Sequence, residues 1–213
     1  EGVPIDAIVL GGRRSDTVPL VFEAREWTKG VLIGASMASE TTAAAQDVSA
    51  NIRRDPMAMK PFCGYNYGDY FAHWLSFDQP SAKLPKVFHV NWFRKGKDGK
   101  FLWPGFGDNM RVLEWMLKRV AGEANAVETP IGNLPREEDL NLEGLNLTDG
   151  ALDELFRVDS GEWREEEVAI GEYLAGYGSH LPGKLKAEQQ RVADALDVAA
   201  EPAAPVRKTA SAS

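Results

Sequence analysis

Cysteine is almost absent from this chain, because Cys63 is the only one among 213 residues. A single cysteine excludes an intrachain disulfide, and nothing else in the sequence requires an oxidising compartment. Long apolar runs are missing too, since no stretch approaches the roughly 20 residues that a membrane-spanning helix needs. We therefore expect a cytoplasmic protein that does not enter a membrane.

Positive charge is scarce: 24 Lys and Arg face 32 Asp and Glu, for a net charge of -8. This balance argues against a general nucleic-acid binder, which usually carries excess cations to meet phosphates. The exception lies between Gln79 and Gly107, where Asp98 is the one acid and the cations are Lys83, Lys86, Arg94, Lys95, Lys97 and Lys100. This region either binds a small polyanion, or Lys95 to Lys100 simply keep a hairpin tip soluble, and charge alone does not decide between the two.

The order of apolar patterns predicts a mixed α/β fold with strands first and helices last. Four segments rich in Val, Ile and Phe, bounded by Gly, Pro or Ser, predict strands at residues 5–12, 18–25, 29–36 and 86–93. The tract 201–213 is expected to be a disordered tail, so that residues 1–200 form the folded part.

Helices are predicted where apolar residues recur at helical spacing. Residues 67–77 predict one short helix, and three helices with acidic exposed faces are expected within 148–200. The segment 108–122 predicts a further helix that begins at Asp108 or Asn109 as a cap and ends at Gly122. Its expected apolar face is Val112, Leu113, Met116, Leu117 and Val120.

The run LGGRRSDTV, residues 10–18, ends a predicted strand in two glycines and two arginines. Glycines permit a tight turn, and an arginine just past a strand end can grip phosphate oxygens with two donors. The alternative is an ordinary turn with solvated arginines. Next, residues 34–56 are mostly small and polar, which fits either a plain surface loop or a mobile lid over a site.

Aromatic side chains gather in HVNWFRKGKDGKFLWPGFGDN, residues 89–109. The rings are those of Trp92, Phe93, Phe101, Trp103 and Phe106, and the polar, glycine-containing tract 94–100 predicts a hairpin between the first two rings and the next two. Two such rings can hold a planar base between them, and Asn109 offers both a donor and an acceptor to a base edge. The competing interpretation is that the rings belong to the core and that Asn109 caps a helix.

Other candidate motifs are weaker. GSHLPGKL, residues 178–185, matches a phosphate-loop pattern but has Leu185 where a Ser or Thr must bind magnesium, and the segment before it predicts a helix rather than a strand. The histidines His73, His89 and His180 lack metal-ligand spacing, and Cys63 is expected to be a buried thiol.

Five segments together resemble the C-terminal third of the GTP-dependent phosphoenolpyruvate carboxykinases: residues 2–14, 39–45, 55–75, 83–116 and 129–132. The resemblance is most specific between Lys83 and Trp115. It implies an enzyme that converts oxaloacetate and GTP to phosphoenolpyruvate, GDP and carbon dioxide, with a divalent metal (Mn²⁺ or Mg²⁺). It also implies a nucleotide site in which Phe93 and Phe106 stack on guanine, Phe101 completes the pocket, Gly107, Asp108 and Asn109 contact the base edge, and Arg13 reaches the phosphates. The implied lid is Glu40, Thr41, Thr42, Ala43, Ala44, Ala45 and Gln46.

The resemblance also implies what this chain lacks. The family's phosphate loop, its metal ligands and its oxaloacetate-binding residues all precede the matched region, so no catalytic or metal-binding residue is assigned here. The expected partner is therefore the remainder of the same enzyme, N-terminal to Glu1, in a protein that is a monomer at full length. Two rivals stay open: a non-catalytic purine-nucleotide or RNA-binding module, and a helical interaction domain made of residues 148–198.

Overall fold

The computed structural model describes residues 2–41 and 52–200. The expected tail 201–213 and the expected lid residues 42–46 lie outside the described residues. Five strands form one sheet in the order β1-β5-β2-β7-β6. β1 (Ala7–Gly11) runs parallel to β5 (Lys86–Val90), whereas β2 (Val21–Glu23), β7 (Gly132–Leu134) and β6 (Val127–Thr129) join antiparallel.

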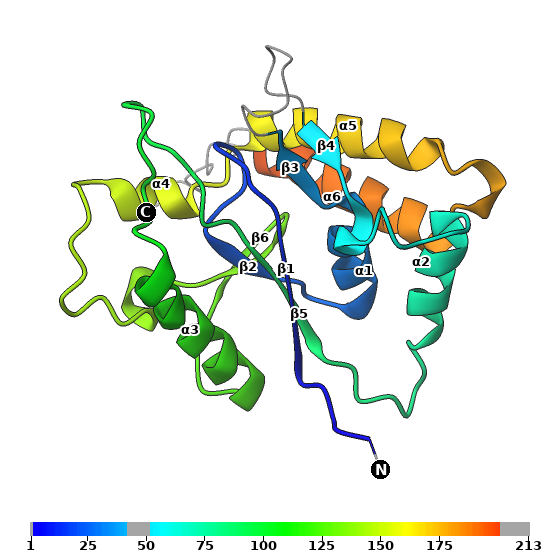
Figure 1. Ribbon diagram of the computed structural model, residues 1–213, viewed down its shortest axis with the longest axis horizontal. Coiled ribbons are helices and arrows are strands. Elements are labelled where there is room, and N and C mark those ends of the chain that lie inside the picture. The colour runs from blue at the N-terminus through cyan, green and yellow to red at the C-terminus, as the bar shows by residue number, and fades with distance from the viewer. Residues whose placement is uncertain (1, 42–51, 201–213) are drawn as a thin grey trace, which may run out of the picture.

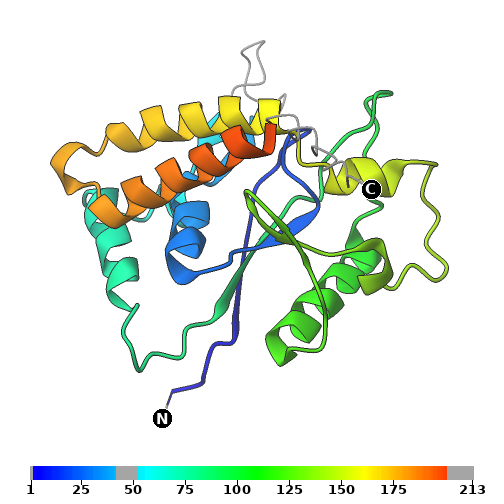
Figure 2. The ribbon, with the colours of Figure 1, turned by 180° about the vertical axis from the view of Figure 1, so that it is seen from behind.

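Helices cover both sides of this sheet (Figure 1 and, from behind, Figure 2). On one side lie α1 (Trp27–Ser36), α2 (Tyr67–Ser76), α5 (Ser160–Ala175) and α6 (Gly183–Ala200), and on the other lie α3 (Asn109–Ala121) and α4 (Ala151–Phe156). Short 3₁₀ turns occur at η1 (Pro56–Ala58), η2 (Phe106–Asp108), η3 (Glu137–Asp139) and η4 (Gly178–His180). The predicted mixed α/β class is confirmed.

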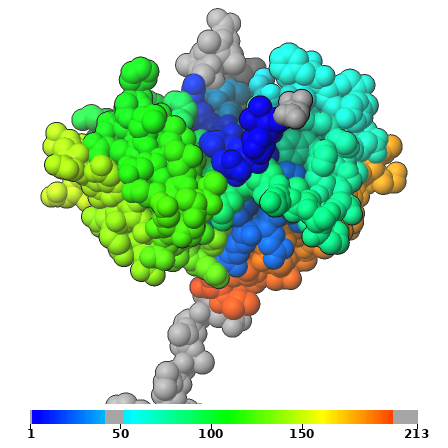
Figure 3. Space-filling view, turned by 90° about the horizontal axis from the view of Figure 1, so that it is seen from below, coloured from blue at the N-terminus to red at the C-terminus, as the bar shows by residue number. Residues whose placement is uncertain are grey.

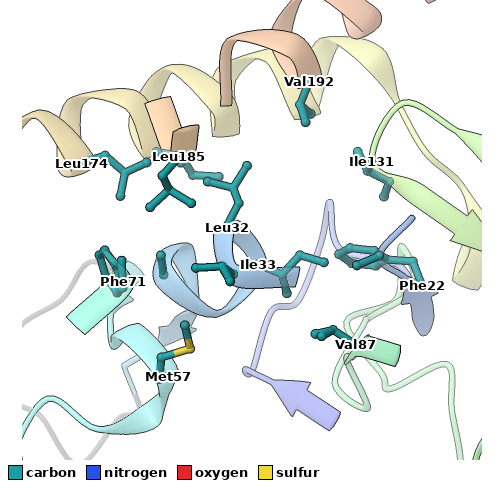
Figure 4. Packing of buried hydrophobic residues seen from close by; sticks show 14 of the residues in the cluster. Phe22, Leu32, Ile33, Met57, Phe71, Val87, Ile131, Leu174, Leu185 and Val192 are labelled. Atoms are coloured by element: carbon teal, nitrogen blue, oxygen red, sulfur yellow. The ribbon is translucent and has the colours of Figure 1, made fainter. Parts of the chain in front are cut away.

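Two hydrophobic clusters fill the space between the sheet and its helices. Neighbouring side chains on β2 and β5 point to opposite faces, as the period of two in a strand requires. Phe22 and Val87 therefore join the α1–α2–α5–α6 side, while Val21 and Phe88 join the α3–α4 side. Figure 4 shows Phe22 and Val87 beside Leu32 and Ile33 of α1 in the first cluster.

The segment 29–36 was predicted as a strand, and this was wrong, because it forms most of α1. Every residue from Lys29 to Ala35 is buried. A helix that is apolar on all sides has no helical period, so a short run of this kind cannot be told from a buried strand by pattern. The prediction also missed β6 and β7, which are only three residues each.

The helix predicted at 108–122 is confirmed as α3, and it ends at Gly122 in the left-handed conformation with φ 76°. Its predicted cap and face need correction. The Asp108 side chain accepts no capping hydrogen bond from the first turn, and the Asn109 side chain accepts from Trp103 instead. Leu117 is 66% exposed, whereas Trp115, absent from the predicted face, is fully buried.

The three predicted C-terminal helices are confirmed as α4, α5 and α6, but their acidic residues are not all exposed. Glu166, Glu167 and Glu188 are each less than 9% exposed. Glu188 accepts two hydrogen bonds from Arg191, and Glu167 accepts one from Gln189. Carboxylates that leave water need such partners, so these acids belong to the packing between α5, α6 and the rest of the molecule.

β1 forms one edge of the sheet, and exposed apolar side chains lie on this strand and on the segment that precedes it. Val3, Ile5 and Val9 are 87%, 64% and 45% exposed. Figure 3 shows this N-terminal segment at the surface between the α3 side and the α2 side. None of the helices within the described ranges is long and apolar enough to cross a membrane.

Candidate functional site

The loop after β1 carries Arg13 and is fastened to a second, two-stranded sheet. That sheet pairs β3 (Ala38–Glu40) with β4 (Ile52–Arg54), the two strands that flank the expected lid. The amide of Arg13 donates to Ser39 Oγ at 3.1 Å, and the amide of Glu40 donates to the Arg13 carbonyl at 2.8 Å. The expected phosphate arginine and the base of the expected lid are therefore adjacent.

Gly12 makes this close approach possible. A Cβ atom at Gly12 would lie 2.0 Å from the carbonyl oxygen of Ala38, which no real side chain tolerates. Beyond Arg13, Ser15 donates from its amide and its hydroxyl to Glu40 Oε1, both at 2.6 Å. Glu40 is thus held at the lid base, while Thr41 is exposed.

Asn91, which the sequence analysis did not single out, clamps the same loop to β5. It is fully buried, its Nδ2 donates to the carbonyls of Arg14 and Val18 at 2.9 Å, and its Oδ1 accepts from the amides of Arg14 and Phe93 at 3.2 Å. One side chain therefore fixes the path of the arginine loop and the start of the aromatic hairpin. A lone polar residue inside the apolar run VFHVNWF was the signal available for it.

The predicted hairpin is confirmed, and it brings Phe93 and Phe101 together. Lys95 and Phe101 form an antiparallel bridge, and the amide of Leu102 donates to the Arg94 carbonyl at 2.9 Å. The two phenylalanine rings meet edge to face with centroids 5.9 Å apart and an interplanar angle of 74°. Phe101 is 57% exposed, so it is not a core residue.

Arg13 lies directly on this aromatic pair. Its guanidinium carbon is 4.9 Å from the centroid of the Phe93 ring, which is within range of a cation–π interaction. Lys95 Nζ lies 5.5 Å from the centroid of Phe101. The structure thus joins Arg13, Phe93 and Phe101, three of the residues predicted for the nucleotide site.

Phe106, Gly107 and Asp108 form η2 immediately before α3. The Phe106 side chain is 98% exposed and its backbone φ is 43°, a value that few non-glycine residues adopt. Asp108 pairs with Arg111 at 2.9 Å. Within the described ranges, the aromatic pairs include Phe93 with Phe101 but no contact of Phe106 with Phe93.

Asn109 turns its side chain toward Trp103 rather than capping α3. Its Oδ1 accepts a hydrogen bond from Trp103 Nε1 at 2.9 Å, and Trp103 is 2% exposed. The carbonyl end of the amide is therefore occupied, and Nδ2 is the end with donors to offer. The local expectation of a helix cap was wrong for this side chain.

The basic charge of the region is smaller than the sequence suggests. Arg94 is fully buried, and Lys86 pairs with Glu23, so neither belongs to a solvated patch. Lys95, Lys97 and Lys100 are exposed on the hairpin, as is Lys83 elsewhere. The prediction of solvated arginines after the glycines is wrong for Arg14, which is 4% exposed and binds Glu166 through two bonds of 3.0 Å.

Glu166 also anchors β4, the strand that follows the expected lid. Arg54, the last residue of β4, donates from Nη1 to Glu166 Oε1 at 2.8 Å and to the Ser36 carbonyl at 2.9 Å. Burial raises the pKa of Glu166, but the bonds from Arg14 and the charge of Arg54 outweigh it and leave the pKa below its ordinary value. This carboxylate therefore stays ionised between two arginines.

The remaining titratable candidates have structural surroundings. His89 is buried and stacks on Phe22 with centroids 5.1 Å apart, and burial followed by the charge of Arg14 lowers its pKa to about 4. His180 Nδ1 is 2.9 Å from Asp69 Oδ1. Cys63 is half-buried rather than buried, which corrects the prediction. The pattern 178–185 follows helix α5 rather than a strand, as expected.

No cluster of three or more His, Cys, Asp or Glu that could hold a metal ion occurs among residues 2–41 and 52–200. A resident divalent metal therefore does not fit the described part of this chain. What the described residues offer is exposed aromatic surface, one arginine on it, and β3 and β4, the two strands that flank the expected lid.

Comparison with known families matches residues 1–195 to the family described as the phosphoenolpyruvate carboxykinase C-terminal P-loop domain. A relative in Chlamydia caviae is 56% identical over 194 residues, covering 90% of this chain and 32% of its own length. Another in Neocallimastix frontalis is 52% identical over 203 residues, covering 92% of this chain and 33% of its own. Both relatives carry the name phosphoenolpyruvate carboxykinase [GTP].

The chain spans about a third of the length of these curated relatives. The match nevertheless extends over both sides of the sheet and over every residue of the aromatic and arginine site. With a family model that covers most of the chain and relatives more than half identical to it, this chain belongs to the GTP-dependent phosphoenolpyruvate carboxykinase family.

Proposed function

We propose that this chain supplies the guanine site, a phosphate arginine and the lid base of an enzyme that converts oxaloacetate and GTP to phosphoenolpyruvate, GDP and carbon dioxide. The observation that carries the proposal is the placement of Arg13. Its guanidinium lies on the Phe93 ring, and its backbone is bonded to β3 at the root of the lid. The relatives named phosphoenolpyruvate carboxykinase [GTP] support the choice of nucleotide.

Base recognition follows from the exposed rings. Arg13 covers one face of Phe93 and Phe101 meets the ring edge to face, so guanine would stack on the other face of Phe93, with Phe106 closing over it. Stacking on an aromatic side chain contributes about 1–3 kcal/mol per base. Asn109 Nδ2 and the backbone of Gly107 and Asp108 would then meet the base edge.

Phosphate positioning and water exclusion would come from the loop and the lid. Arg13 would neutralise phosphate oxygens from its place beside Phe93, and the exposed hairpin lysines would form the rim. Closure of the segment between β3 and β4 would exclude water, so that the enolate left by decarboxylation takes up the phosphoryl group instead of a proton.

The divalent metal that the family implies would be held mainly by residues outside this chain, as the resemblance to the family implies. We therefore expect the isolated 213-residue chain to have no turnover, because it needs the remainder of the enzyme. The complete enzyme is expected to be a monomer in the cytoplasm. Measurable decarboxylation of oxaloacetate by the isolated chain would contradict this part of the proposal.

Titration of the complete enzyme with GTP and with ATP tests the guanine site. We expect a clear preference for GTP, and a Phe106→Ala variant should bind GTP about tenfold more weakly, because it loses one stacking face. Phe77→Ala is the matched control, since Phe77 is also well exposed, at 49%, but lies at the end of α2.

Equal affinity for GTP and ATP would remove the guanine assignment. Binding of single-stranded RNA without turnover would instead favour a non-catalytic nucleotide or RNA-binding module, which the aromatic and lysine-bearing hairpin also suits. The net charge of -8 speaks against that alternative.

A further inference from the structure

Arg94 is the largest charged side chain that the structure buries completely. Its exposed fraction is 0%, although it lies on the hairpin between the exposed Lys95 and the partly exposed Phe93. A buried charge persists only when it is paired and hydrogen-bonded, so its partners show what it holds together.

Those partners come from two distant parts of the chain. Nη1 donates to the Thr17 carbonyl at 3.4 Å and to the Arg157 carbonyl at 3.1 Å, and Nη2 donates to Glu154 Oε1 at 2.9 Å. Thr17 belongs to the loop that carries Arg13, whereas Glu154 and Arg157 belong to α4 and its C-terminal end. One guanidinium therefore connects the arginine loop, the hairpin and α4.

The support behind Arg94 is itself a network. Arg157 donates from Nε to Glu154 Oε2 at 3.0 Å and from Nη2 to Glu162 Oε1 at 2.8 Å. Glu154 is consequently held by two arginines, and burial, which raises its pKa, is outweighed by the bonds from Arg157 and Arg94. These bonds connect the Arg94 partner Glu154 on α4, through Arg157, to Glu162 on α5.

The backbone of Arg94 lies where the site is assembled. Arg94 is buried, whereas Phe93 before it is half-buried and Lys95 after it is exposed. Its carbonyl accepts from the amide of Leu102, next to Phe101, and the following amide, of Lys95, donates to the Ser15 carbonyl at 2.8 Å. Movement of Arg94 would therefore displace Phe93, Phe101 and the Arg13 loop together.

We propose that Arg94 is a positioning residue that holds the Phe93 ring against the Arg13 guanidinium, so that base and phosphate recognition share one geometry. The inference rests on the proposed function of this site. Arginine is required because its planar group donates in two directions at once, to carbonyls on one side and a carboxylate on the other. A lysine has no such fork.

The test measures the affinity of the complete enzyme for GTP and its unfolding midpoint in Arg94→Lys and Arg94→Gln. Arg119→Gln is the matched control. Arg119 lies in the last turn of α3, is also largely buried, and donates to the Glu23 carboxylate and to the Ala124 carbonyl. We expect both kinds of variant to unfold at lower temperature, but only the Arg94 variants to lose GTP affinity, by about tenfold or more.

A double-mutant cycle separates positioning from general destabilisation. Phe93→Leu and Arg13→Gln should be coupled in GTP binding when Arg94 is present, and nearly additive in the Arg94→Lys background. Should the Arg94 variants not fold, Glu154→Gln replaces them, since it weakens one of the Arg94 bonds, and it should weaken GTP binding in the same direction.

Unchanged GTP affinity, or unchanged coupling between Phe93 and Arg13, in folded Arg94 or Glu154 variants would overturn the inference. Failure of the unmodified enzyme to prefer GTP over ATP would instead overturn the proposed function, and the two results are distinguishable because only the second concerns the unmodified protein.

Discussion

The carboxylate of Glu166 on α5 accepts two hydrogen bonds, each of 3.0 Å, from the guanidinium of Arg14 in the loop after β1. The two residues are 152 positions apart in the chain. Arg54 joins the same carboxylate from β4. Glu166 therefore connects Arg14, which follows the proposed phosphate arginine Arg13, to β4, the strand that follows the proposed lid.

Replacement of Glu166 by glutamine should destabilise the protein strongly. Two buried arginines would lose their negative partner, and removal of one member of a buried ion pair typically lowers the free energy of unfolding by about 3–5 kcal/mol. Because the folded-state pKa of Glu166 lies below its ordinary value, its contribution is present at neutral pH and is lost as pH falls through that lowered pKa. Thermal unfolding at pH 7, and at a series of pH values that extends well below the ordinary pKa of 4.5, measures both effects.

Glu165→Gln is the control for this change, because Glu165 is the adjacent residue of α5 and is exposed. Its effect should stay within about 0.5 kcal/mol. Similar losses of stability in the two variants would show that the Arg14–Glu166–Arg54 network has no special role.

His89 should make the protein less stable in mild acid. Its pKa is lowered from 6.5 to about 4 in the folded state, first by burial and then by the charge of Arg14. The unfolded state therefore binds the proton first, and stability that is present above pH 6.5 is lost as pH falls toward 4, by up to about 3 kcal/mol. Urea unfolding between pH 4 and 8 should show this slope, and His89→Phe, which keeps the stack on Phe22, should reduce it.

His73→Phe serves as the comparison, since His73 is exposed on α2. We expect it to leave the pH dependence as it is. A slope that survives in His89→Phe would assign the acid sensitivity to other groups.

Gly12→Ala should separate the arginine loop from β3. The added Cβ would lie 2.0 Å from the Ala38 carbonyl oxygen, so the backbone must move, and overpacking of this kind typically destabilises by about 1–3 kcal/mol. If β3 is the root of the lid, closure should also suffer, and a larger fraction of oxaloacetate should leave the complete enzyme as pyruvate. Product analysis checks this, with Gly64→Ala as control because nothing lies within 4 Å of a Cβ there. An unchanged pyruvate fraction would show that the contact between the arginine loop and β3 does not affect lid closure.

Local signals predicted much of this fold. The alternation of Phe22 with Val21 and of Val87 with Phe88 reflects the period of a strand with two buried faces, and Gly122 ends α3 as its left-handed conformation requires. Helix α1 was missed because complete burial removes the helical period from its apolar run. The family resemblance, rather than any local pattern, selected Arg13, Phe93 and Phe101.

The parts that escaped prediction depend on long-range pairing. Asn91 is separated by 77 residues from Arg14, and Glu166 by 112 residues from Arg54. Sequence spacing shows which residues share a helix face or a strand face, but it does not show which buried carboxylate will meet which arginine. The sequence therefore offered a solvated arginine as one interpretation of Arg14, and counted Arg94 among the cations of the basic region, although both side chains are buried.

Asn109→Asp should shift nucleotide preference from GTP toward ATP. In the structure Asn109 Oδ1 accepts from Trp103 Nε1, which directs the Nδ2 donors toward a base edge. Guanine presents the acceptor O6 at that edge, whereas adenine presents the N6 donor group. A carboxylate at this position keeps the bond to Trp103 but repels O6 and accepts from N6. The ratio of GTP to ATP affinity, measured by titration of the complete enzyme, should therefore fall by about tenfold or more.

Asp108→Asn is the matched control, because Asp108 pairs with Arg111 and contributes only its backbone to the proposed site, so its variant should keep the preference for GTP. The two variants change the local charge in opposite directions, so an equal shift in both would show that any side-chain change at this turn disturbs the site. An unchanged ratio in Asn109→Asp would show that the base edge is read by other groups.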